Sequence, residues 1–303
     1  MEPARLNGHV YESPGSPDHD AGGPEAPFSA RWERRPKFQD RRWLHSLLFL
    51  LTIASTWLTG GWAYSVTILA ILGCHEFGHY FMCRYYDVDA SLPYFLPVPI
   101  TLTGTLGAFI RIREPIHSKR LFFDIGIAGP IAGFLVALPA LFIGVFLSRV
   151  APIGPGDNLW LGEPLLFKIA QRLFWGPIPD GYTLVLHPVG FAAWFGMLAT
   201  ALNLFPFGQL DGGHISYAVL GRRSTYVTVA MVGVALTLSY LSMSWVAWTV
   251  LMIVMLFTFG IRHPRTYDEE EPLDRTRLIL AAFAALIFAL CFTPAPIELL
   301  IPR

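Results

Sequence analysis

Two histidines separated by three residues, with a glutamate directly after the first, form the part of this sequence best suited to chemistry. His75, Glu76 and His79 make the pattern His-Glu-x-x-His within an apolar stretch. On an α-helix, side chains at positions i and i+4 lie one turn apart on the same face. The two imidazoles can therefore supply two ligands of a tetrahedral Zn²⁺ ion, and Glu76 can take a proton from a water activated by that ion.

The surroundings of this pattern strengthen the metal interpretation. The pattern lies in a segment apolar enough to cross a membrane, where a carboxylate costs about 2.5–3.5 kcal/mol on insertion scales. A bound cation would offset that cost. The alternatives are a packed His–Glu–His cluster with internal hydrogen bonds, or a proton relay that uses no metal.

A catalytic zinc site needs a third protein ligand, because three side chains leave one position for water. The stretch NLFPFGQLDGGH at 203–214 offers two candidates, Asp211 and His214. Pro206 breaks the preceding helix and the glycines permit an irregular turn, so we expect Asp211 on a loop that faces the two histidines. Asp211 could instead only cap a helix that starts near Ile215.

Asn203, at the start of the same stretch, has two interpretations. Its amide could donate to a substrate carbonyl or to the oxyanion of the transition state. It could equally make a hydrogen bond between helices, and the spacing does not decide between these roles.

The elements that must position these residues are those of a membrane protein. Of the 303 residues, 53% are hydrophobic and 15% charged, with 22 Lys+Arg against 22 Asp+Glu, whereas soluble domains carry about 25% charge. Residues 43–75, 224–261 and 278–297 contain no Asp, Glu, Lys or Arg. These features exclude a soluble domain, a disordered chain and a disulfide-stapled secreted domain, and no basic domain suited to nucleic acid is present.

We therefore predict an all-α polytopic membrane protein with six to seven transmembrane helices. Gly60-Gly61 is the natural break in the first apolar run, which is too long for one span. The predicted spans cover residues 44–60, 62–83, 121–148, 187–206, 225–242, 245–261 and 278–294.

Three other segments differ from these spans. Residues 90–118 are apolar but rich in Pro and Gly, and 103–112 within them is typical of a strand, in a hairpin or a re-entrant segment. Residues 163–175 predict a short amphipathic helix at the outer surface. Residues 1–40 predict a disordered polar and basic cytoplasmic tail, followed by a transmembrane catalytic domain at 44–297.

The distribution of basic residues predicts the orientation. With the amino terminus in the cytoplasm, most Lys and Arg residues fall on inner segments, as the positive-inside rule requires. The first thirty residues are acidic and lack the pattern of a secretory signal or a transit peptide. We therefore expect a multi-pass protein of a bacterial inner membrane, with a plastid membrane as the weaker alternative.

The sequence resembles the site-2 protease family of intramembrane zinc metalloproteases. The resemblance rests on HEFGH at 75–79 and NLFPFGQLDGG at 203–213, supported by DIGIAGPIAGF at 124–134. It extends over GTLGAFIRI at 104–112 and HPRTYDEEEPLDRTR at 263–277, which are similar to the bacterial and plastid branch. It covers residues 44–290 and leaves the tail unmatched.

The resemblance implies one Zn²⁺ per chain, held by His75, His79 and Asp211, with Glu76 as general base and acid and Asn203 helping to position the substrate. The implied substrate is a transmembrane segment of another protein in the lipid bilayer. The segment at 149–186 is too short for the PDZ domain of some relatives, which puts PDZ-gated selection in doubt. The alternative function is a transporter or proton relay that uses the same ionisable residues.

Overall fold

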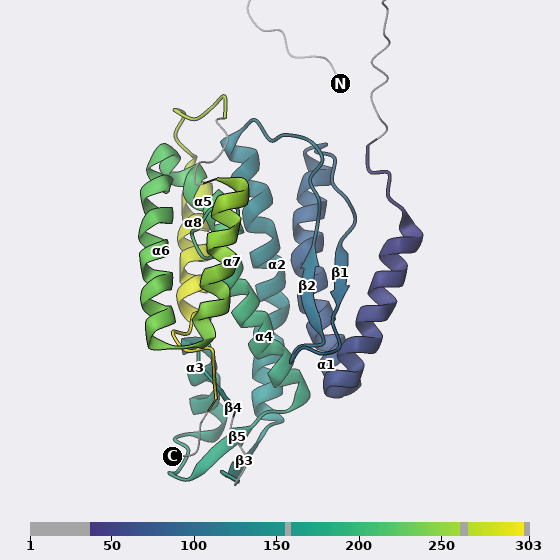
Figure 1. Ribbon diagram of the computed structural model, residues 1–303, viewed down its shortest axis with the longest axis vertical. Helices are drawn as coiled ribbons and strands as arrows, with labels where there is room; N and C mark the ends of the chain where they lie inside the picture. The colour runs from purple at the N-terminus through teal and green to yellow at the C-terminus, as the bar shows by residue number, and fades with distance from the viewer. Residues whose placement is uncertain (1–36, 155–158, 261–265, 300–303) are drawn as a thin grey trace, which may run out of the picture. The chain divides into compact units, whose positions relative to one another are not determined.

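The computed structural model describes residues 37–154, 159–260 and 266–299, and most of them are helical (Figure 1). The described residues belong to one compact unit. Most of the predicted tail therefore lies outside the described residues. Of its last four residues, Phe38 donates its N–H to Asp89 over 2.6 Å, and Asp40 accepts the N–H of Leu92 over 3.0 Å.

The first helix is broken at the predicted position. Helix α1 (Arg42–Tyr85) departs from helical geometry at Gly61, whose φ of 77° and ψ of 179° favour a residue without a side chain. The break divides α1 into two arms. Across it, the hydroxyls of Thr56 and Ser65 share a hydrogen bond of 2.7 Å, which ties the arms together.

A β-hairpin lies between the two arms of α1 (Figure 1). Strand β1 (Tyr94–Pro97) pairs antiparallel with β2 (Thr105–Phe109). Phe95 packs against Phe49 on the first arm and lies 3.8 Å from the position a Cβ would take at Gly73 on the second. At the tip, Tyr64 donates its hydroxyl proton to the Thr103 carbonyl over 3.0 Å. The strand-like segment expected near 103–112 is therefore present, as one half of a hairpin that lies beside the helices.

The core lies where three helices meet. Helix α2 (Lys119–Phe146) packs against the second arm of α1 and against α4 (Pro188–Asn203). Trp194 and Met197 of α4 and Leu141 of α2 are fully buried there. At the far end, Gly144 and Gly190 bring the backbones of α2 and α4 so close that a Cβ at Gly144 would overlap Gly190.

Three of the remaining helices follow predicted spans closely: α6 (Ser224–Leu241), α7 (Ser244–Phe259) and α8 (Arg275–Cys291). The short helix α5 (Asp211–Leu220) and the 3₁₀ turn η1 (Gly221–Arg223) lie between α4 and α6, where no span was predicted. Within the described residues, three helical segments are long and apolar enough to cross a membrane: Arg42–Tyr85, Lys119–Phe146 and Asp211–Leu241. The shorter helix Ser244–Thr258 is also apolar.

A short helix and two short strand pairs lie beyond the end of α2, and the sequence predicted only the helix. The amphipathic helix expected at 163–175 is α3 (Leu165–Trp175). Two additional strand pairs flank it: β3 (Arg149–Pro152) with β5 (Tyr182–Val185), and β4 (Leu159–Leu161) with β6 (Ile297–Leu299). These strands are three or four residues long, too short to produce an alternating pattern.

Candidate metal centre

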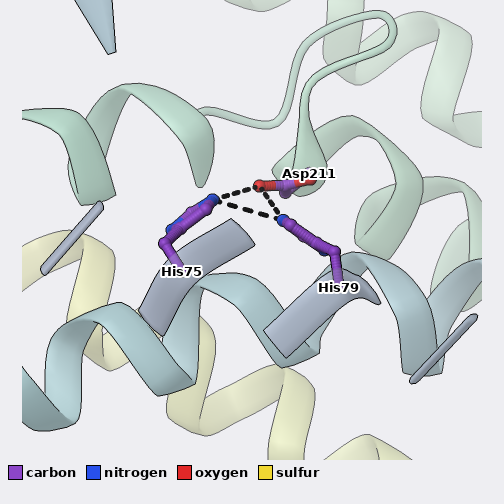
Figure 2. Close-up of side chains that lie close together, drawn as sticks. All are labelled: His75, His79 and Asp211. Atoms are coloured by element: carbon purple, nitrogen blue, oxygen red, sulfur yellow. Dashed lines mark hydrogen bonds and ion pairs between the residues drawn. The ribbon is translucent and has the colours of Figure 1, made fainter. Parts of the chain in front are cut away.

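The second arm of α1 places the two histidines of the sequence pattern next to each other. His75 and His79 are both buried and lie one helical turn apart on the face directed at α2 and α5. Their Nε2 atoms are 3.2 Å apart. Figure 2 shows the two rings pointing toward the same side of the helix, where the third residue of the cluster lies.

Asp211 completes this cluster from the opposite side (Figure 2). Its Oδ2 lies 3.3 Å from Nε2 of His75 and 3.3 Å from Nε2 of His79. The expectation of a loop position was wrong in one respect: Asp211 is the first residue of α5, and this helix starts four residues earlier than Ile215. The carboxylate is therefore held by a helical backbone rather than by a flexible turn.

The turn before α5 explains how Asp211 reaches this place. Helix α4 ends at Asn203, three residues before Pro206, and Gly208 adopts a φ of 46°. A Cβ at Gly212 would overlap the carbonyl of Leu204, and one at Gly213 would overlap the carbonyl of Gly208. Phe205 and Phe207 anchor the turn in a buried cluster with Trp245 and Met252. The turn can therefore fold back tightly only because glycine occupies both positions.

The three side chains fit a zinc ion. In a tetrahedral site with metal–ligand bonds of about 2.0–2.1 Å, two ligand atoms are about 3.3–3.4 Å apart. The three separations in the cluster are 3.2, 3.3 and 3.3 Å. Within the described part of the chain, His75, His79 and Asp211 form the group of His, Cys, Asp and Glu side chains able to share one ion. Two imidazoles and one carboxylate with a fourth position open are typical of catalytic zinc.

The backbone of α2 orients one of the two rings. Nδ1 of His79 lies 2.6 Å from the carbonyl oxygen of Ile125. Because a carbonyl can only accept, Nδ1 carries the ring proton of the neutral imidazole and Nε2 keeps its lone pair. Such a partner fixes the tautomer that a metal ligand needs.

Two glycines of α2 make room for the histidine rings, a role that the sequence did not reveal. A Cβ at Gly129 would overlap the ring of His79, and one at Gly133 would lie 3.1 Å from Cβ of His75. From the other side, a Cβ at Gly78 would lie 2.6 Å from the carbonyl oxygen of Ala128. The surface on which α1 and α2 pack is therefore also a wall of the site.

Glu76 faces a cavity next to the cluster. It is buried, and Ile110, just past β2, lines the same cavity. The cavity has a volume of about 640 Å³. Its wall includes Ala108 and Phe109 of β2, Ile110 directly after it, and the site residues His75, Glu76, His79, Asn203 and Asp211. A polypeptide segment entering this cavity would meet the carboxylate and the three candidate ligands together.

The other predicted site residues also have definite places. Asn203 is the last residue of α4, and its Nδ2 lies 3.0 Å from Nε2 of His75. His214, the rival third ligand, stacks on Phe122 with ring centroids 5.3 Å apart and is not part of the three-residue group. Asp211 is thus the residue that joins the two histidines.

One protein family model covers the part of the chain that contains these residues. A family model described as peptidase family M50 matches residues 63–243. The matched stretch contains Glu76, Asn203 and all three residues of the cluster.

Curated plant proteins are similar to the same region. "Probable zinc metalloprotease EGY2, chloroplastic" of Arabidopsis thaliana is 30% identical over 182 residues, covering 58% of this chain and 32% of that protein. "Probable zinc metalloprotease EGY1, chloroplastic" of Oryza sativa subsp. japonica is 31% identical over 188 residues, covering 59% and 32%. "Probable zinc metallopeptidase EGY3, chloroplastic" of Arabidopsis thaliana is 29% identical over 245 residues, covering 74% and 40%. The chain therefore spans about a third to two fifths of the length of these relatives.

Proposed function

Because the chain belongs to peptidase family M50, the site-2 protease family, we propose that it is a membrane-embedded zinc metalloprotease that hydrolyses a peptide bond within or near a transmembrane segment of another protein. The observation that carries this proposal is the cluster of His75, His79 and Asp211 in one cavity with Glu76. The names of the plant relatives, which describe zinc metalloproteases, support the same activity.

We propose a distinct role for each residue of the site. His75, His79 and Asp211 hold the zinc ion. When bound, zinc polarises a carbonyl and lowers the pKa of a coordinated water to about 7. Glu76 accepts the proton of the attacking water and later delivers it to the leaving amine, as a general base and then a general acid. Asn203 donates its amide to the scissile carbonyl as negative charge develops on the oxygen.

The hairpin offers a way to present the substrate. A transmembrane helix hides its peptide bonds, so it must unwind before its backbone can be attacked. In the two-stranded sheet, β1 covers one edge of β2, and no other described strand pairs with the second edge. Ala108, Phe109 and Ile110 of this strand and its continuation line the cavity. An unwound segment that adds to the free edge of β2 would hold its peptide bonds along the cavity wall.

We propose that the site lies within the bilayer and opens to the cytoplasmic side. We also propose that the protein crosses the membrane six to seven times, and the candidate spans are the two arms of α1, α2, α4, α6, α7 and α8. Acidic and basic side chains gather at the end of the fold where α1 ends and α2 and α8 begin, which the positive-inside rule assigns to the cytoplasm. The bacterial inner membrane was favoured by the sequence alone, and the chloroplast location in the names of the relatives weighs against it.

The test uses the full chain in detergent or nanodiscs and a panel of single-span model substrates with helix-breaking residues in their membrane segments. Mass spectrometry of the products should locate a cut within or beside the membrane segment. Glu76→Gln should retain zinc and lose this cut by about 10²–10⁴-fold, because the general base is removed while the ligands stay. Cleavage that survives in Glu76→Gln would exclude the proposed mechanism. Wild-type protein that holds zinc but cuts no substrate of the panel would point instead to a metal-binding scaffold.

A further inference from the structure

The structure contains a charged network directly beside the residue that orients His79. Asp124 of α2 precedes Ile125, whose carbonyl accepts the Nδ1 proton of His79. The Asp124 side chain is mostly buried and accepts a hydrogen bond from Nε of Arg277 over 2.9 Å. A second contact joins Nη2 of Arg277 to the other carboxylate oxygen, so the pair is bidentate. Pairs of this geometry fix orientation as well as charge.

The same network reaches the helix that carries the histidines. Tyr86, the residue directly after the last residue of α1, donates its hydroxyl proton to Oδ2 of Asp124. Tyr86 follows His79 by seven residues. Asp124 therefore ties the end of α1 to the second turn of α2, close to where the backbone of α2 contacts the ring of His79.

Arg277 is itself held at the start of α8. Its side chain also contacts Asp274, which caps α8 by accepting the N–H of Arg277 over 3.0 Å. Arg277 is thus fixed by its own helix and presents its guanidinium to Asp124. It lies beyond residues 63–243, the part of the chain that matches the family model.

We propose that Arg277 is a positioning residue for the metal centre, acting through Asp124 and the Ile125 carbonyl on the tautomer and orientation of His79. The inference rests on the proposed zinc site. Helices α1 and α2 have little room to move relative to each other near His79. Gly129 of α2 lies against the His79 ring, and Gly78 of α1 lies against the backbone of α2. Without Arg277 the buried carboxylate of Asp124 would lose its cation and the first turns of α2 would shift. The Ile125 carbonyl would then no longer hold the proton on Nδ1.

The experiment measures the rate at which zinc leaves the folded protein into an excess of the chelator 4-(2-pyridylazo)resorcinol. The variants are Arg277→Met, Arg277→Lys and Asp124→Asn, and the matched control is Arg275→Met, which alters an exposed arginine of the same helix. Loss of a ligand's hydrogen-bond support costs about 10–100-fold in metal affinity. We expect zinc release to accelerate at least tenfold in Arg277→Met and Asp124→Asn, by a smaller factor in Arg277→Lys, and to stay unchanged in Arg275→Met.

A purely structural role predicts a different result. It would lower the melting temperature of the metal-free protein while folded protein released zinc at the wild-type rate. Release rates within twofold of wild type in folded Arg277→Met and Asp124→Asn would therefore overturn the inference. If Arg277→Met does not fold, Arg277→Lys and Tyr86→Phe give the same comparison with smaller changes. If the wild-type protein binds no zinc, the proposed function itself is wrong. That result differs both from accelerated zinc release and from release at the wild-type rate.

Discussion

Gly129 of α2 lies against the imidazole of His79, and a Cβ at this glycine would overlap the ring. The two helices can approach this closely only because the position carries no side chain. The contact fixes the register of α1 on α2, and that register decides whether His79 meets Asp211. Helix packing and ligand geometry are therefore one property of this structure.

Gly129→Ala should consequently damage the metal centre. The added methyl group must displace the His79 ring or separate the helices, so we expect zinc content to fall well below that of wild type. The matched control is Gly233→Ala in α6, where an added Cβ would meet no atom within 4 Å. Zinc content and melting temperature of both variants provide the check. Equal zinc in Gly129→Ala and Gly233→Ala would show that the contact does not constrain the ligand.

The helical segments and the ligand candidates were predictable because strong local signals mark them. Long uncharged runs mark the helices, Gly60-Gly61 marks the break in α1, and the spacing of His75 and His79 marks one helix face. The third ligand remained open between Asp211 and His214 until the resemblance to a family was considered. Spacing alone does not tell which of two residues on one helix faces a distant partner.

Other parts of the site depend on tertiary contacts and leave no local signal. Helix α5 starts at Asp211 although two glycines follow, because Gly212 and Gly213 fit against backbone carbonyls that belong to the preceding turn. Helix propensity predicts a later start, and packing overrides it. The Ile125 carbonyl is a backbone group, so no residue type reveals its role.

Asn203 gives a second test of the site. Its amide is 3.0 Å from the ring nitrogen of His75 that belongs to the cluster. We expect Asn203→Ala to lower kcat about 10²–10³-fold, the usual cost of losing one oxyanion donor, while zinc content stays at the wild-type level. Asn203→Asp controls for side-chain size and should be as inactive, because a carboxylate cannot donate. Wild-type turnover in Asn203→Ala would refute the role in catalysis.

The free edge of β2 predicts a backbone effect on cleavage. Consecutive residues of a strand direct their N–H groups to opposite edges. One of the two variants Ala108→Pro and Phe109→Pro therefore removes an N–H donor from the free edge of β2. The other variant removes an N–H donor that faces β1. The free-edge variant should lose at least tenfold in cleavage while keeping zinc and its melting temperature. The other variant should melt at a lower temperature.

Phe109→Ala provides the matched control for this pair, because it shortens the side chain and keeps the N–H group. It should cleave far better than the free-edge proline variant. If neither proline variant alters cleavage in protein that still holds zinc, the substrate does not add to β2 as a strand.

The contact between Asp268 and α2 predicts a dependence of stability on pH. Asp268 accepts hydrogen bonds from the Ser118 hydroxyl and the Lys119 N–H, both over 2.7 Å, at the start of α2. Partial burial favours the neutral acid, but these hydrogen bonds dominate and lower the pKa of Asp268 below its ordinary value of 3.8. Because the pKa is lower in the folded state, the stabilisation is complete above about pH 4 and is lost as the pH falls through the folded-state pKa.

Asp268→Asn replaces one of the two accepting oxygens by an NH₂ group, which cannot accept a hydrogen bond. One hydrogen bond contributes about 1 kcal/mol, and solvent screens a partly exposed carboxylate, so the melting temperature at pH 7 should fall by a few degrees. The difference from wild type should shrink as the pH falls below about 4. Glu270→Gln, at an exposed neighbouring position, should melt like wild type at every pH. A constant difference between wild type and Asp268→Asn from pH 7 to pH 3 would contradict the account.

The most direct measurement is zinc per chain in the purified 303-residue protein. Wild type should contain about one zinc ion, the double variant His75→Ala/His79→Ala none, and Asp211→Ala much less than wild type because one of three ligands is missing. Glu76→Gln should retain the wild-type content. Folded wild-type protein without zinc, or zinc that persists in His75→Ala/His79→Ala, would contradict the assignment of the metal centre and favour a relay or transporter built from the same residues.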